Sequence, residues 1–79
     1  MQLSQEMVIN VIRDMGLVEV ASNLEVDEAL KNYGVDSLDM MSILLSVQEI
    51  TGVEVHDEDI DQLTSVKEIC NYFNKVIIL

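Results

Sequence analysis

Residues 34–52, with the sequence GVDSLDMMSILLSVQEITG, are the stretch that decides the fold. Between the two glycines, apolar residues recur at the spacing of a helix. Asp36 is a suitable N-cap, because its carboxylate can accept backbone N–H groups of the first turn. Asp39 adds a second carboxylate where the helix dipole favours negative charge, and Gly52 can end the helix. The stretch therefore predicts a helix over residues 37–51.

Two more helices are predicted on either side of this one. Residues 4–15 carry an apolar stripe of helical spacing. The segment begins with Ser4, a suitable N-cap, and it is followed by Gly16, which can stop the helix. Toward the C-terminus, Ser65 and Glu68 form an S-x-x-E capping box. Behind this box a further stripe consists of Val66, Ile69, Cys70, Phe73, Val76 and Ile77.

The connections between these helices differ in character. Periodicity decays over residues 17–36, which we expect to be a long loop held to the core by scattered apolar side chains. Residues 57–63 are expected to form a short helix. The sequence therefore predicts an all-α fold, a small four-helix bundle of three main helices plus one short helix, with a long loop between the first and second main helices.

Length and composition restrict the function. The 79 residues suit a single domain spanning 1–79, with little stability to spare for a preorganised catalytic pocket. The net charge of −11 argues against nucleic acid and against stable insertion into or docking on an anionic membrane. One cysteine cannot form an internal disulfide, no Cys/His cluster suggests zinc, and no signal peptide is evident. These features favour a cytoplasmic binding module or carrier.

The predicted helix over residues 37–51 has three faces. Met40, Ile43, Leu44 and Val47 form the natural core face, and Asp39, Ser42, Ser46 and Glu49 form a polar one. Leu38, Met41 and Leu45 form a third, apolar face that a simple bundle does not require. This face either packs under the long loop or serves as a docking surface for a partner whose cations surround an apolar patch.

Ser37 lies where the long loop meets the N-terminus of this helix. Its side chain should be exposed, and the free amide groups of the first turn would favour a bound phosphate. The alternative is an ordinary first-turn or capping serine, which any helix can have. Spacing alone favours this second interpretation.

The segment YGVDSLD at residues 33–39 resembles the acyl carrier protein family. The resemblance continues through the following helix and, without a gap, through residues 53–55 (VEV), 57–59 (DED) and 63–66 (LTSV) to the last helix. The first helix agrees in position and character, so the resemblance covers nearly the whole chain. DSL alone is a weak string, but DSLD after a glycine, in an acidic chain of this length, is a strong one.

This resemblance implies that Ser37 receives a 4′-phosphopantetheine arm from coenzyme A. A separate phosphopantetheinyl transferase, using Mg²⁺, would form the phosphodiester bond. The thiol of the arm would carry acyl groups as thioesters in fatty-acid, polyketide or related biosynthesis. The chain would be a carrier and not an enzyme, which agrees with the lack of a nearby histidine to form a triad with Ser37.

The resemblance also implies where partners dock: at Asp36, Leu38, Asp39, Met41, Leu45 and Glu49. The implied partners are the transferase and the acyl-transferring and chain-modifying enzymes, which would present basic docking patches to a monomeric carrier. Ser42 and Gln48 replace acids common in carriers of bacterial fatty acid synthesis, and His56 stands where the family often has proline. These departures count against a housekeeping role and leave a specialised pathway open.

Two other classes of function are compatible with parts of the sequence. Asp57, Asp59 and Asp61 occupy positions one, three and five of an EF-hand loop, with Glu68 at position twelve. The pattern lacks the turn glycine at position six and the apolar residue at position eight, so a calcium-binding module is the minor alternative. A non-covalent interaction protein is the other, and it predicts that Ser37 can be replaced without effect.

The five methionines are the last feature that bears on function. Methionine side chains are flexible and fill irregular spaces. They suit either an adaptable cavity for an acyl chain or plain filling of the core, and the two uses are compatible.

Overall fold

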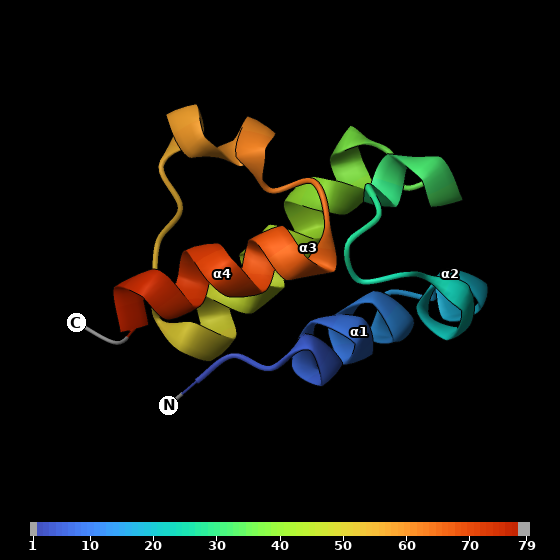
Figure 1. The fold of residues 1–79 in the computed structure, drawn as a ribbon, viewed down its shortest axis with the longest axis horizontal. Helices are drawn as coiled ribbons and strands as arrows, with labels where there is room; N and C mark the ends of the chain where they lie inside the picture. The colour runs from blue at the N-terminus through green and yellow to red at the C-terminus, as the bar shows by residue number, and fades with distance from the viewer. Residues whose placement is uncertain (1, 78–79) are drawn as a thin grey trace.

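The computed structural model describes residues 2–77, which contain helices and no strand. In chain order the elements are α1 (Gln5–Asp14), α2 (Val18–Asn23), the 3₁₀ helix η1 (Leu30–Tyr33), α3 (Ser37–Thr51), the 3₁₀ helix η2 (Asp57–Gln62) and α4 (Val66–Ile77). Figure 1 shows these elements as a small helical bundle, with both ends of the described chain on the same side. The all-α prediction is confirmed.

The predicted capping residues lie at the helix termini as expected. At α1, Ser4 Oγ accepts the N–H of Met7 at 3.2 Å, and at α4, Ser65 Oγ accepts the N–H of Glu68 at 3.2 Å. The C-terminus of α3 is closed by Gly52, whose φ of 73° lies in the left-handed region that favours glycine. Local capping chemistry therefore determines where these helices begin and end.

The connection predicted over residues 17–36 is held to the core by apolar side chains as expected, but it is not a loop throughout, because it contains α2 and η1. A helix of six residues has fewer than two turns, too short for a period to emerge from the sequence. Packing on α1 stabilises α2, with Ala21 buried and the Leu17 N–H bonded to Ile12 O at 3.3 Å. Tertiary contacts have overridden weak local propensity here.

The core is formed mainly by one face from each of the three longer helices, and α1 packs against α2, α3 and α4. Several core side chains are completely shielded from solvent: Val8, Ile12, Leu30, Ile43, Val47, Val66, Ile69 and Phe73. The predicted core face of α3 is confirmed, since Ile43, Leu44 and Val47 are buried and Met40 is half-buried against them. The N-terminal segment joins this core through Leu3, whose N–H and C=O both bond to the Asn74 side-chain amide at 2.7 and 2.9 Å.

The predicted short helix is present as η2, and side-chain hydrogen bonds attach this region to the long helices. In the preceding loop, the Val55 N–H donates to Gln48 Oε1 on α3 at 3.0 Å. From α4, the Tyr72 hydroxyl donates to Asp59 Oδ2 at 2.9 Å. Partial desolvation and this bond to Asp59 raise the pKa of Tyr72 above its ordinary value. Two side chains on different helices thus help to position η2.

Candidate functional site

Ser37 is the first residue of α3, and its side chain is exposed. The residue before it, Asp36, has extended backbone and acts as the N-cap, with Oδ1 accepting the N–H of Asp39 at 2.8 Å. Ser37 is therefore a first-turn residue, as one form of the alternative interpretation held, but it is not the cap, because Asp36 performs the capping. The Ser37 hydroxyl remains accessible for other chemistry.

The cap makes a testable contribution to stability. Replacing Asp36 by alanine removes the acceptor for the Asp39 N–H and should lower the free energy of unfolding by about 1 kcal/mol. Asp36→Asn keeps an acceptor oxygen and should retain most of that stability. Urea denaturation followed by circular dichroism measures both variants. Equal losses for alanine and asparagine would mean that the carboxylate charge, and not capping, stabilises this end of α3.

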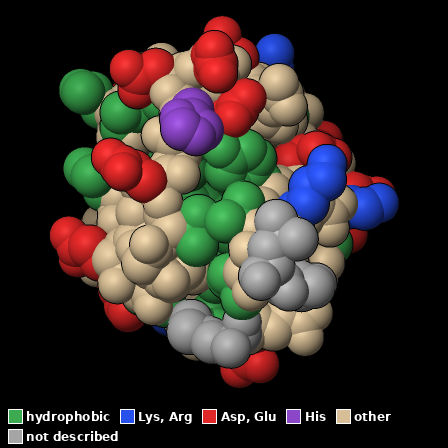
Figure 2. All heavy atoms as spheres, turned by 90° about the vertical axis from the view of Figure 1, so that its left-hand side faces the viewer, with side chains coloured by type: hydrophobic (Ala, Val, Ile, Leu, Met, Phe, Trp, Pro, Cys, Tyr) green, Lys and Arg blue, Asp and Glu red, His purple; other side chains and the backbone are tan. Residues whose placement is uncertain are grey.

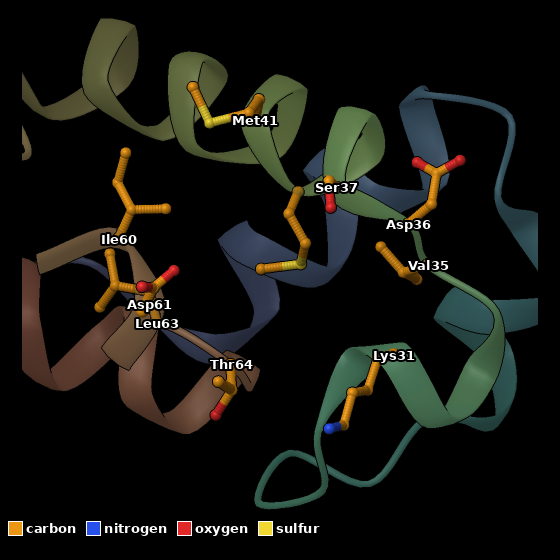
Figure 3. A pocket seen from close by; sticks show the side chains of 10 residues that line it. Lys31, Val35, Asp36, Ser37, Met41, Ile60, Asp61, Leu63 and Thr64 are labelled. Carbon is orange, nitrogen blue, oxygen red and sulfur yellow. The ribbon is translucent and has the colours of Figure 1, made fainter. Parts of the chain in front are cut away.

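A cavity of about 370 Å³ opens beside Ser37. Figure 3 shows it between the start of α3, η1 and the segment around η2, with the Asp36 side chain pointing away from it. Its apolar walls come from Val35, Met40 and Met41 on one side and from Ile60 and Leu63 on the other. Polar groups also line it: Lys31, Asp36, Ser37, Asp61 and Thr64. An exposed hydroxyl thus lies at the edge of a space of ligand-pocket size.

Two of the methionines lie at this cavity, Met40 and Met41. Met7 and Met15 instead pack, half-buried, against the core. Met1 lies outside the described residues. The methionines therefore divide between the wall of a cavity, at Met40 and Met41, and the filling of the core, at Met7 and Met15.

The third face of α3 is exposed. Leu38, Met41 and Leu45 have exposed fractions of 78%, 44% and 55%. The interpretation in which this face packs under the preceding loop is therefore wrong. Glu49, one turn beyond Leu45, is exposed as well, and Asp39 at the other end is half-buried. Three large apolar side chains in contact with water, with carboxylates nearby, form a surface suited to binding a partner.

Acidic side chains are gathered on the surface, but in the part of the chain that the structure describes they do not form a metal site. Figure 2 shows several carboxylates around the single histidine, His56, which precedes η2. Within the described residues, no group of three or more His, Cys, Asp or Glu side chains is placed to hold a metal ion. The predicted EF-hand ligands Asp57, Asp59, Asp61 and Glu68 are therefore not brought together. Asp59 accepts a hydrogen bond from Tyr72 instead.

The sequence interpretation missed the far side of the cavity. Ile60 and Leu63 were given no role within the predicted short helix, but they form an apolar wall opposite α3. Their three-residue spacing within a run of acids is the signal that could have identified them. Lys31 was missed because it lies in η1, inside the segment expected to be a loop.

Comparisons with known proteins agree with this geometry. Residues 10–73 match the family described as "Phosphopantetheine attachment site". An acyl carrier protein of Coprothermobacter proteolyticus is 30% identical over 60 residues, which cover 76% of this chain and 73% of that protein. One of Campylobacter concisus is 27% identical over 66 residues, or 84% of each chain. A mitochondrial acyl carrier protein of Dictyostelium discoideum is 44% identical over 45 residues, covering 57% of this chain and 38% of the relative.

No solved structure matches the chain significantly. The family match nevertheless covers most of the sequence, so the class is that of carriers to which a phosphopantetheine group is attached. The chain belongs to the acyl carrier protein family, whose members carry acyl groups on phosphopantetheine and are not catalysts.

The residues present fit the prosthetic group that this family carries. Attachment requires an accessible hydroxyl, and Ser37 is exposed. The adjoining cavity is lined by both polar and apolar side chains, which suits an arm that has a phosphate at one end and an acyl group at the other. None of the helices in the described part of the chain is long and apolar enough to cross a membrane.

Proposed function

We propose that Ser37 is the attachment point of 4′-phosphopantetheine and that this chain presents acyl thioesters on the arm to biosynthetic enzymes. The single observation that carries the proposal is the exposed hydroxyl at the N-terminus of α3, beside the cavity. The phosphodiester would lie where the unpaired N–H groups and the helix dipole favour negative charge. Intact-mass spectrometry of the chain, after incubation with coenzyme A, Mg²⁺ and a broad-range phosphopantetheinyl transferase, tests it by the addition of one group.

The arm would supply the thiol that accepts the acyl group. The chain's own thiol is unsuited to this task, because Cys70 lies buried in α4 at 5% exposure. Burial also raises the pKa of the Cys70 thiol, so the nucleophilic thiolate is disfavoured. The protein's role is therefore to hold the arm and to be recognised, while partner enzymes activate the Ser37 hydroxyl and the thioester.

The cavity would shelter the start of the cargo. Met40, Met41, Ile60 and Leu63 offer apolar walls to methylene groups near the thioester. Burying each methylene stabilises the loaded state by about 0.8 kcal/mol, which a partner must offset when it draws the chain out. Flexible methionines on one wall allow the space to adapt to chains of different shape.

Partners would dock on what we call the docking stripe, which consists of Asp36, Leu38, Asp39, Met41, Leu45 and Glu49. The exposed apolar side chains supply area that loses water in the complex, and the carboxylates guide partners with basic patches. The transferase and the acyl-transferring and chain-modifying enzymes are the partners that this surface fits. Electrostatic attraction of this kind raises the rate at which partners associate with the carrier, and it does not require that they dissociate slowly.

The docking stripe has fewer acidic neighbours than the resemblance led us to expect, and this supports a specialised pathway. Ser42 is exposed but uncharged. Gln48 is half-buried, and its side-chain oxygen is engaged with the Val55 N–H. The carboxylates that remain at Asp39 and Glu49 should therefore account for a large share of the steering.

Reversing these charges should slow partner reactions. Asp39→Lys and Glu49→Lys are each expected to lower kcat/KM for transferase loading up to about tenfold at low salt, because basic partners are no longer steered to α3. The difference should shrink as ionic strength rises past about 0.15 M, where the Debye length falls to about 8 Å. Asp14→Lys, at the exposed end of α1 outside the docking stripe, is the matched control. Equal effects of all three reversals would show that net charge alone matters.

A further inference from the structure

Lys31 is, among the described residues lining the cavity beside Ser37, the one with a positive charge. Asp61 brings negative charge to the same cavity, whereas the Asp36 carboxylate points away from it, in a chain whose net charge is −11 with only four lysines and arginines. A cation at this position is therefore a local exception to the charge of the whole molecule. Among the described residues that line the cavity, Lys31 is the cationic side chain with which an added anion could pair.

The fold keeps Lys31 at this place. Its neighbour Leu30 is completely buried, and the Leu30 N–H donates to Thr64 O at 2.8 Å, which joins η1 to the segment before α4. After η1 the chain turns at Gly34, whose φ of 85° is left-handed and whose N–H donates to Lys31 O at 3.1 Å. This turn returns the chain to the same cavity at Ser37. Figure 3 shows Lys31 and Ser37 on different elements around one space.

A phosphodiester on Ser37 would add a negative charge close to two existing ones. Asp36 precedes Ser37 in the chain, and Asp39 lies in the same helical turn. The α3 N-terminus offsets part of this repulsion, but Asp36 already accepts the Asp39 N–H. A lysine ammonium on a flexible four-carbon side chain can approach a phosphate from across the cavity and is strongly attracted to it.

We propose, resting on the function proposed above, that Lys31 is a positioning residue for the prosthetic group: its ammonium pairs with the phosphodiester on Ser37. The pairing biases the arm toward the cavity instead of leaving it extended in solvent. Lys31 is exposed, so the pair is of the surface kind and can break when a partner draws the arm away.

The test uses the loaded holo-protein and phosphorus NMR. Lys31→Gln should shift the ³¹P resonance of the phosphodiester, and it should remove the NOE between the Lys31 ε-methylene and the arm methylene next to the phosphate. Lys31→Arg should restore the wild-type ³¹P position in large part, because it restores the charge. Lys75→Gln, in the last turn of α4 and outside this cavity, is the control and should leave the resonance unchanged. Raising the salt concentration should move the wild-type resonance toward that of Lys31→Gln.

Each outcome decides between the two proposals. A ³¹P resonance that is the same in wild type, Lys31→Gln and Lys75→Gln, with no NOE from Lys31, overturns the pairing but leaves attachment at Ser37 intact. A shift of equal size in both glutamine variants also overturns it, because total charge would then be the cause. Absence of any phosphodiester resonance, together with an unchanged intact mass, overturns attachment and pairing together.

Discussion

Ser37→Ala is expected to abolish loading completely. After incubation with coenzyme A, Mg²⁺ and a broad-range transferase, wild type should gain the mass of one phosphopantetheine group and the variant none. The reason is chemical, since no phosphodiester can form without the hydroxyl, and no other group at this position can replace it. The fold should survive, because Ser37 is exposed and Asp36 provides the cap of α3.

A second serine on the same helix provides the control. Ser42 is exposed on α3, and Ser42→Ala should load like wild type. Circular dichroism of both variants should match wild type, which separates loss of the attachment point from loss of the fold. Loading of Ser37→Ala, or failure of wild type to load under conditions that modify a known carrier, would disprove the proposed function. A non-covalent interaction protein would show the second result.

Phe73→Ala should have the largest effect on stability, with a loss of about 3–5 kcal/mol in the free energy of unfolding. Phe73 is completely buried, and its ring packs edge-to-face on Tyr72 with centroids 5.7 Å apart. Small proteins have roughly 0.05–0.15 kcal/mol of stability per residue, so a loss of this size consumes a large part of the total. The urea midpoint should fall sharply, and at 37 °C a substantial fraction of the variant should be unfolded.

The control for this variant lies on the same helix. Val76 is 45% exposed, and Val76→Ala should change the free energy of unfolding by no more than about 0.5 kcal/mol. A similar, small loss for both variants would mean that α4 is not packed into the core as described. Since loading needs Ser37 presented at a formed α3, the unfolded fraction of Phe73→Ala should also resist the transferase.

Much of the fold follows from local sequence. The N-caps at Ser4, Asp36 and Ser65 each act on a backbone N–H three residues further on, so a short window of sequence contains the whole interaction. The apolar stripes likewise repeat within one or two turns. The three main helices were predictable for this reason, and so was an exposed serine at the start of α3.

The errors arose where stability comes from distant residues. The sequence of α2 contains too few turns for a period, and its packing on α1 stabilises it. Periodicity could not decide whether the long loop covers the helix face with Leu38 and Leu45. It predicts on which side of the helix a side chain lies, but not which other segment packs against that side. The EF-hand pattern, already a minor alternative for lack of its turn glycine, also rests on spacing along the chain, and in the described residues its oxygen ligands are not brought together in space.

The sequence by itself determined the helical class, the ends of the main helices and the position of Ser37, because these depend on residues within four positions of one another. Only the tertiary structure decided that Lys31, Met40 and Ile60 surround one cavity beside Ser37. These three side chains come from η1, α3 and η2, and they meet because buried side chains and the bonds from Leu30 to Thr64 and from Tyr72 to Asp59 hold the elements together. Such long-range packing is a property of the folded chain and has no signature in any single segment.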